Sequence, residues 1–297
     1  MAIEINNSTN EILVNGSPLG GASFDPSSIT FGGDLNDLVS GSATGDNLTN
    51  LTQTFNGVWT HRIAASSQVS QISNTPLGLD ATGYFLADLQ SAPSAVPTIG
   101  VLTFRHQDIL NNTLMSTSGS VVITTRVRPI ISTALSGDNT ISAFIGSAEF
   151  DNTFYDGIDP NDGNNQALRP QTMAGLSFDF STGVSQASAL RRTGGSTTLS
   201  TAKANLTSNN WYWFRATLAF NGSSYTSVTG DYSTDGLTWV NFATNSGTVG
   251  FGDDHYFGFI GWVNGTSGLG WVRFVVDYMS LEIVGTMDRA GSTPTIV

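Results

Sequence analysis

Two acidic residues separated by one position are the first candidates for chemistry in this chain. Glu149 and Asp151 flank Phe150 in a run that is typical of a strand, and alternate residues of a strand point to the same face. Glycoside hydrolysis with retention uses two carboxyls about 5 Å apart, one as nucleophile and one as acid/base. The pair therefore provides the enzymatic hypothesis for the chain, a glycoside hydrolase that uses Glu149 and Asp151.

A second candidate is the loop from Asp156 to Asn165, which combines oxygen-bearing side chains with glycines. Carboxylate and amide oxygens are the ligands that calcium prefers. The spacing misses the EF-hand pattern by one residue, and a long polar loop held by Asx-turns explains the same composition. Calcium is the only cofactor that we consider, and its expected ligands are Asp156, Asp159, Asn161 and Asp162.

A third candidate is a set of tryptophans and arginines at alternate positions of strand-like runs. Aromatic rings stack on sugar rings and arginine binds carboxylates or hydroxyls, so these residues predict a glycan-binding face on one sheet. The same residue types concentrate in subunit interfaces, and a loop of the monomer that covers the tryptophans is the third alternative. The residues are Trp211, Trp213, Arg215, Arg126, Arg128, Trp271 and Arg273.

Composition excludes several other kinds of site and partner. Cysteine is absent, which excludes disulfides, thiolate metal sites and thiol catalysis. The formal net charge is −12 and Lys203 is the only lysine. Nucleic acids and anionic membranes bind to clustered basic residues, so we expect neither as a partner. No apolar run approaches the roughly 20 residues that a membrane-spanning helix needs.

The elements that must position these side chains are strands, because the apolar residues recur with a period of two. In the run 211–220 the apolar residues are Tyr212, Phe214, Ala216, Leu218 and Phe220. In the run 271–283 we expect Val272, Phe274, Val276 and Tyr278 on one face. Two further runs are 227–240 and 255–263. Asp235-Gly236 lies inside the run 227–240 and predicts a hairpin turn, since glycine supplies the positive φ that such turns require.

Further strand-like runs fill the rest of the chain, and no amphipathic helix is evident. Short strands at regular spacing with turn signals between them indicate two stacked antiparallel sheets. The expected strands are 52–63, 83–88, 98–105, 118–127, 140–150, 175–180 and 184–190. These observations predict an all-β protein with a two-sheet antiparallel jelly-roll sandwich.

Three segments carry a resemblance to a known superfamily. Trp211 to Arg215, Tyr232 to Trp239 and Phe274 to Leu281 resemble the last strands of concanavalin A-like and laminin G-like lectin and glucanase sandwiches. The resemblance covers residues 205–285 best and implies a fold shared by lectins, glycosidases, adhesion modules and viral coat or fibre domains.

Within that resemblance, Glu149 and Asp151 look like the opening of the Glu-x-Asp-x-x-Glu motif of family sixteen glycoside hydrolases. The third position of the motif is occupied by Phe154, and Asp156 is displaced from it by two residues. The acid/base carboxyl is therefore missing, and we expect no enzymatic activity.

The chain divides into two parts by composition. Residues 1–50 are rich in turn signals and are expected to form an extended arm or anchor with short strands, and residues 51–297 are expected to form the sandwich. Met1 is followed by no signal-peptide pattern, although the low charge and the abundance of polar and aromatic residues are typical of extracellular proteins.

A virion component, for which we expect a phage protein, reconciles these two observations, because it is synthesised in the host cytoplasm and acts outside the cell. The main functional prediction is thus a capsid decoration, head fibre or tail appendage. We expect a homotrimer that binds other virion proteins through residues 1–50 and can contact a cell-surface glycan. The alternative is a stand-alone carbohydrate-binding lectin module, which needs neither the arm nor an oligomer.

Overall fold

Every regular element that the computed structural model describes is a β-strand. Side chains are described for residues 119–132, 141–148, 172–181, 183–250, 257–258, 270–282 and 284, and the other strands are described by their backbone. The described strands form two large antiparallel sheets and one small sheet. The predicted all-β sandwich of two antiparallel sheets is therefore confirmed.

The first large sheet has eight described strands. Its order places β12 and β19 at the centre and β15 at one edge. The strands, from that edge, are β15 (Ser196–Asn205), β14 (Val184–Thr193), β13 (Met173–Ser181), β12 (Thr140–Glu149), β19 (His255–Asn264), β10 (Ile99–Arg105), β7 (Trp59–Ala64) and β6 (Gln53–Phe55).

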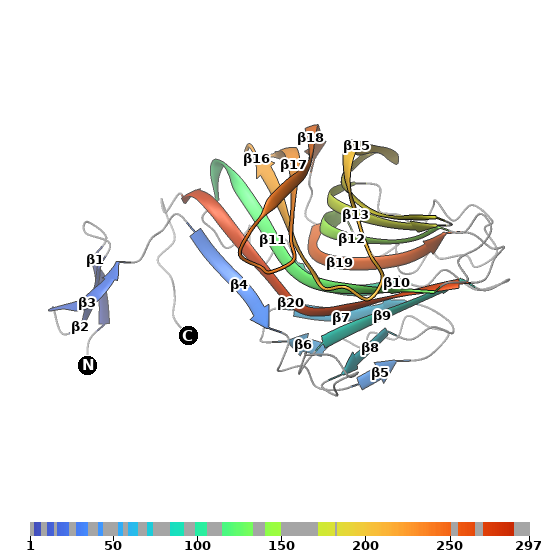
Figure 1. The fold of residues 1–297 in the computed structure, drawn as a ribbon. Coiled ribbons are helices and arrows are strands. Elements are labelled where there is room, and N and C mark those ends of the chain that lie inside the picture. Colours follow the sequence, from blue (N-terminus) through green and yellow to red (C-terminus); the bar gives the residue numbers. More distant parts are fainter. Residues whose placement is uncertain are drawn as a thin grey trace.

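The second large sheet has nine described strands joined by backbone pairing. It curves around β12, β13 and β19 of the first sheet (Figure 1). Its strands, in spatial order, are β18 (Val240–Gly250), β17 (Ser224–Ser233), β16 (Tyr212–Phe220), β11 (Met115–Ile131), β20 (Gly270–Met287), β9 (Tyr84–Ser91), β8 (Ser70–Ser73) and β5 (Gly41–Ala43), and β4 (Ser28–Asp34) pairs with β20 beside this path.

The expected arm of residues 1–50 is divided between two sheets. Strands β1 (Ile3–Asn6), β2 (Glu11–Val14) and β3 (Ser17–Ser23) form the small sheet. Strands β4 and β5 instead pair with β20 and β8 of the nine-stranded sheet. The division of the chain at residue 50 stays a prediction.

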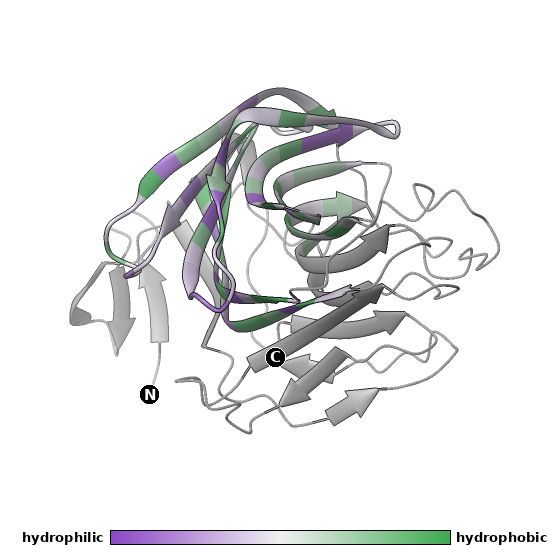
Figure 2. Ribbon diagram, turned by 45° about the vertical axis from the view of Figure 1, so that its right-hand side comes forward, coloured by the Kyte–Doolittle hydropathy of each residue, from purple (hydrophilic) through white to green (hydrophobic). Residues whose placement is uncertain are grey.

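Strand β16 shows why these residues adopt extended structure. Its residues alternate between buried and half-buried along the whole strand, and the neighbouring β11 alternates in the same way between Val121 and Ile130. A period of two places every second side chain in the core and leaves the others on the opposite face. Figure 2 shows this alternation of apolar and polar residues along the described strands.

Aromatic side chains from both sheets meet between them. Phe178 of β13 packs edge to face on Phe214 of β16, with ring centroids 4.9 Å apart. Phe180 and Phe274 form a second pair between β13 and β20 at 5.2 Å. Such pairs contribute about 0.5–1.5 kcal/mol beyond the burial of their area. They define the core side of each sheet, and the other side of the nine-stranded sheet is called the outer face below.

The eight-stranded sheet is also buried on the side away from the core, at its centre. Residues 141–148 of β12 are all buried. Gly146 and its partner Gly175 pack so closely that a Cβ on Gly175 would lie 2.1 Å from the carbonyl oxygen of Ile145, and the ring of Phe144 occupies the space next to both glycines. This side is called the second face below.

The turn between β17 and β18 confirms the predicted hairpin, with Gly236 at a φ of 75°. Strand β15 was not predicted. It is an edge strand, and only Ser200 and Ala204 of its residues are buried. An edge strand exposed on both faces needs no apolar alternation, so the period of two does not identify it.

Candidate functional site

The outer face brings together the tryptophans and arginines that the sequence singled out. Cross-strand pairing places Arg126 of β11 beside Trp213 of β16 and beside Tyr278 of β20. Side chains paired across antiparallel strands point to the same face. All seven predicted residues lie on this face: Arg126 and Arg128 on β11, Trp211 just before β16, Trp213 and Arg215 on β16, and Trp271 and Arg273 on β20.

Guanidinium groups cover the indole rings on this face. The Cζ atom of Arg126 lies 4.4 Å from the ring centroid of Trp211, and that of Arg128 lies 5.9 Å from the same ring. Arg273 covers Trp271 in the same way at 4.6 Å. A sugar stacks on an uncovered ring face, so the rings of Trp211 and Trp271 offer less stacking surface than their number in the sequence suggests.

A β-bulge brings two residues of β20 to the outer face together. The pairing of β11 with β20 shifts by one residue between Arg126 and Val127, so Asp277 is the extra residue. The prediction that Tyr278 follows Val276 on the core side is therefore wrong, and Met279 takes the core position instead. The bulge lets Asp277 bind Arg126, with 2.8 Å between Oδ2 and NH1, while the ring of Tyr278 packs on Trp213 at 5.0 Å.

The turn between β17 and β18 covers part of Trp213. A Cβ on Gly236 would lie 3.0 Å from the indole, so the glycine backbone is in contact with the ring. Ser233 Oγ accepts hydrogen bonds from the amides of Asp235 and Gly236. Of the alternatives for Trp213, partial cover by a loop of the same chain is therefore what the structure shows.

The carboxylate of Asp235 holds the second half of this turn. Its Oδ1 accepts hydrogen bonds from the amides of Leu237 and Thr238, at 2.8 and 2.7 Å. The backbone N–H of Thr238, then that of Leu237, and the Ser233 hydroxyl lower the pKa of Asp235 well below its ordinary value, because each stabilises the ionised form. At neutral pH the ionised carboxylate therefore accepts these hydrogen bonds across the turn.

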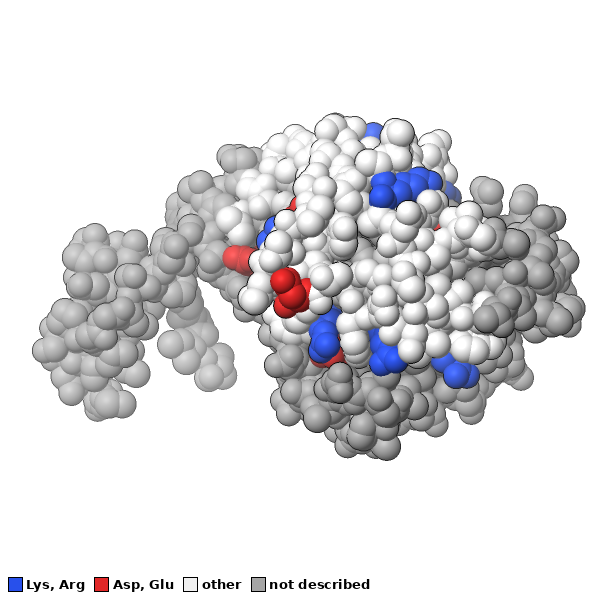
Figure 3. All heavy atoms as spheres, in the orientation of Figure 1, with Lys and Arg blue, Asp and Glu red and all other residues white. Residues whose placement is uncertain are grey.

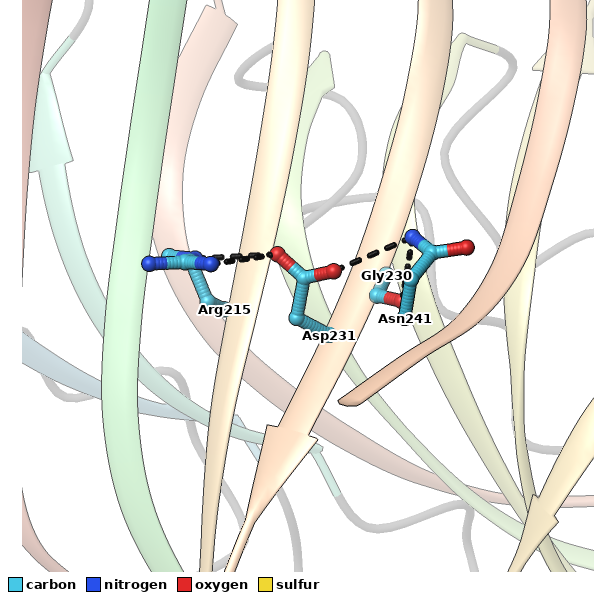
Figure 4. Close-up of polar contacts among 4 residues, drawn as sticks. All are labelled: Arg215, Gly230, Asp231 and Asn241. Atoms are coloured by element: carbon cyan, nitrogen blue, oxygen red, sulfur yellow. Dashed lines mark hydrogen bonds and ion pairs between the residues drawn. The ribbon is translucent and has the colours of Figure 1, made fainter. Parts of the chain in front are cut away.

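A chain of polar contacts crosses β16, β17 and β18 on the outer face (Figure 4). Arg215 donates from Nε and NH2 to Oδ2 of Asp231, at 3.0 and 2.8 Å. Asn241 donates from Nδ2 to Oδ1 of Asp231 at 3.0 Å and to the carbonyl of Gly230 at 3.3 Å. Trp239 covers the guanidinium of Arg215 at 4.4 Å. Arg215, Asp231, Asn241 and Trp239 are called the polar row below.

The polar row leaves two hydrogen-bonding groups without a partner among the described residues. These are NH1 of Arg215 and Oδ1 of Asn241, which points away from the other residues in Figure 4. One is a donor and the other an acceptor. Of the four residues of the polar row, the sequence predicted Arg215 alone as a binding residue. The sequence of the run 227–240 does not distinguish Asp231 from its neighbours. Only the pairing of β16 with β17 reveals that Asp231 lies opposite Arg215.

The other predicted sites fall largely outside the described residues. Glu149 is the last residue of β12 and pairs with His255, but its side chain is not among those described. Asp151 and the four expected calcium ligands, Asp156, Asp159, Asn161 and Asp162, lie outside the described residues. Within the described part of the chain, no three histidine or acidic side chains gather as a metal site would require.

The charged side chains of the described surface form small separate groups on an otherwise uncharged face (Figure 3). Ion pairs among the described residues are Arg126 with Asp277 and Arg215 with Asp231, both on the outer face. In the part of the chain that the structure describes, no helix has the length and apolar character needed to cross a membrane.

Comparison with known proteins gives structural matches only. No protein-family model and no curated protein matches the sequence. A protein of unknown function from Shewanella oneidensis MR-1 has a similar structure with a TM-score of 0.54 and 12% identity, over 88% of this chain and 91% of that chain. An alginate lyase in complex with alginate trisaccharide matches with a TM-score of 0.46 and 11% identity, over 86% of this chain and 98% of that chain.

Peanut lectin matches with a TM-score of 0.44 and 10% identity, over 86% of this chain and the whole of that chain. At these identities the likeness concerns the fold alone. The sheet topology agrees with the two-sheet sandwich that the sequence predicts. The chain is therefore an all-β protein whose described strands form a two-sheet antiparallel sandwich.

Proposed function

We propose that the protein is a carbohydrate-binding module of the lectin type that binds neutral glycan hydroxyls at the polar row. The observation that carries the proposal is the pair of groups without a described partner on the outer face, Arg215 NH1, whose guanidinium lies against Trp239, and Asn241 Oδ1. A sugar presents hydroxyls that both donate and accept, so a donor and an acceptor in fixed positions suit it.

The internal contacts of the polar row favour binding because they already hold its side chains in place before a ligand binds. Both oxygens of Asp231 are engaged, one by Arg215 and one by Asn241. A ligand that binds groups already held in place loses less conformational entropy. The exposed position of Asn241 leaves this end of the row accessible.

The other predictions for function remain predictions. The virion role, the homotrimer and the binding of virion proteins through residues 1–50 rest on composition. None of the similar structures named above is described as a virion protein. Hydrolysis by Glu149 and Asp151 is the second alternative, and release of reducing sugar that disappears in Glu149→Gln is its test.

Titration of neutral oligosaccharides by calorimetry, after a glycan screen, tests the proposal. Asn241→Ala removes an acceptor and a support of Asp231, and should weaken binding about three- to tenfold, as expected for one hydrogen bond. The matched control is Asn205→Ala, because Asn205 is an exposed asparagine of the other sheet. Equal affinities of the two variants, or no glycan bound by the wild type, would exclude the polar row as a glycan site.

A further inference from the structure

Arg192 lies on the second face of the eight-stranded sheet, away from the polar row. The regular pairing of β14 with β13 puts Ala187 and Ala189 on the core side. Arg192, in register with Met173, therefore points to the opposite side. On β15 its cross-strand partner is Thr197, which is exposed. Arg192 thus lies between a buried position of β13, Met173, and an exposed position of β15, Thr197.

The guanidinium is buried without a counter-ion among the described residues. Arg192 is 6% exposed, its Nε has no hydrogen-bond partner, and neither ion pair of the described residues includes it. Its one hydrogen bond runs from NH1 to Oγ1 of Thr197, at 2.7 Å. Burial lowers the pKa of Arg192, since the desolvated cation is destabilised. A buried charge with one neutral hydrogen-bond partner destabilises the folded state, because the lost hydration is only partly replaced.

Two other arginines of the chain show what the unpartnered side of Arg192 can hold. Arg215 uses Nε and NH2 together for one carboxylate oxygen of Asp231. Arg128 uses the same two nitrogens for the amide oxygen of Asn209. In Arg192 the bond to Thr197 uses NH1, and Nε has no hydrogen-bond partner, so the edge formed by Nε and NH2 has no printed bond to a described residue.

We propose that Arg192 binds the carboxylate of a ligand through Nε and NH2, with Thr197 fixing the orientation of the guanidinium from NH1. Two parallel N–H donors match the two oxygens of a carboxylate in one plane. The ligand supplies the counter-ion that the described residues do not provide.

Charge favours a carboxylate over a phosphate or another polyanion. The site provides one cation in a chain with a formal charge of −12, so a second negative charge on the ligand would be repelled rather than neutralised. The same face carries hydroxyl side chains: Ser142 and Ser177 donate to Asp179, and Ser188 Oγ is buried without a partner. A sugar acid and a simple carboxylate share the required chemistry, and the ligand series below distinguishes them.

Titration of the full chain with sodium glucuronate, sodium acetate and glucose tests the proposal, observed at the arginine Nε–H signals by NMR. The expected result is a saturable shift of the Arg192 signal with a carboxylate and none with glucose. Tighter binding of glucuronate than of acetate would assign the site to a sugar acid, and equal binding to a simple carboxylate. No shift of the Arg192 signal with either carboxylate overturns the proposal, without need of any variant.

Two variants separate this site from general electrostatics. Arg192→Lys keeps the charge but loses the paired donors and should weaken carboxylate binding about tenfold or more, the effect of a hydrogen bond to a charged group. Lys203→Gln is the control, because it removes an exposed positive charge from the neighbouring β15 and should leave binding unchanged. Equal weakening by both variants would show a long-range charge effect and contradict a site at Arg192.

The folding stability of a third variant keeps the proposal testable if binding is weak. Arg192→Met removes an uncompensated buried charge, so without ligand its melting temperature should equal or exceed that of the wild type. Glucuronate should raise the melting temperature of the wild type but not that of the variant, because a ligand of the folded state stabilises it. A large loss of stability in Arg192→Met would assign the guanidinium a structural role instead.

Discussion

The side-chain amide of Asn245 donates a hydrogen bond to the carbonyl oxygen of Ala189, at 3.1 Å, and so joins β18 of one sheet to β14 of the other. Ala189 lies at the register shift between β14 and β15. The N–H of Ala189 donates a hydrogen bond to Ser200 Oγ at 3.0 Å. Side chains from two strands thus replace the ladder bonds that the shift removes, as buried backbone groups require.

Substitution of Asn245 should therefore separate the edges of the two sheets. Asn245 also donates to the carbonyl of Thr198 and accepts from Nε of Arg191. Asn245→Ala leaves two carbonyls and a guanidinium without these partners, and should lower the free energy of unfolding by about 2–4 kcal/mol. Urea denaturation measures the loss. The exposed Asn205→Ala should stay within about 0.5 kcal/mol of the wild type, and a similar loss in both would contradict this role.

Gly236 combines two constraints that a pair of glycine variants can separate. Gly236 has a φ of 75°, and a Cβ there would press on Trp213. Gly183 has a φ of 73°, but a Cβ there would meet nothing within 4 Å. Gly183→Ala should cost about 1 kcal/mol for backbone strain alone. Gly236→Ala should cost more in thermal or chemical unfolding, and equal losses would show that the Trp213 contact is loose.

Close packing at the centre of the eight-stranded sheet excludes any side chain at Gly175. A methyl group there would lie 2.1 Å from the carbonyl oxygen of Ile145, and a backbone atom of a central strand cannot move aside locally. Gly175→Ala should therefore destabilise the protein by about 3 kcal/mol or more. Gly250→Ala, at the end of β18 with nothing within 4 Å of the added Cβ, should be nearly neutral by the same denaturation assay.

The turn at Asp235 predicts a pH dependence of stability. The pKa of Asp235 is lower in the folded chain than in the unfolded chain, chiefly because the amides of Thr238 and Leu237 bind the ionised carboxylate. Its stabilisation is complete above the unfolded pKa of about 3.9 and is lost as the pH falls through the folded pKa. The melting temperature, measured from pH 6 to pH 2, should therefore fall below about pH 4 through this group.

Asp235→Asn should flatten that part of the pH profile, because an amide does not titrate in this range. The control is Thr234→Ala, an exposed neighbour in the same turn, which should keep the dependence of the wild type. Parallel profiles for the wild type and Asp235→Asn would mean that other carboxyls dominate the acid transition.

The sequence predicted several strands that have an apolar face, such as β16, and missed others, among them β15. The alternation in 211–220 matches β16 closely, because half of that strand contacts the core. Strand β15 escaped prediction because its edge position exposes both faces, so its residues need no such pattern. The candidate site was predicted in part. Arg215 and the tryptophans were identified by type, whereas Asp231 and Asn241 became evident only from the pairing of β16, β17 and β18.

The sequence by itself determined the all-β sandwich, the hairpin at Asp235-Gly236 and the face on which Trp213 and Arg215 lie. These follow from local rules, namely the period of two and the positive φ of glycine. Only the tertiary structure decided that the bulge at Asp277 turns Tyr278 toward Trp213, and that Arg126 covers Trp211. Register between strands distant in the chain sets such contacts, and a shift of one residue reverses which face a side chain occupies.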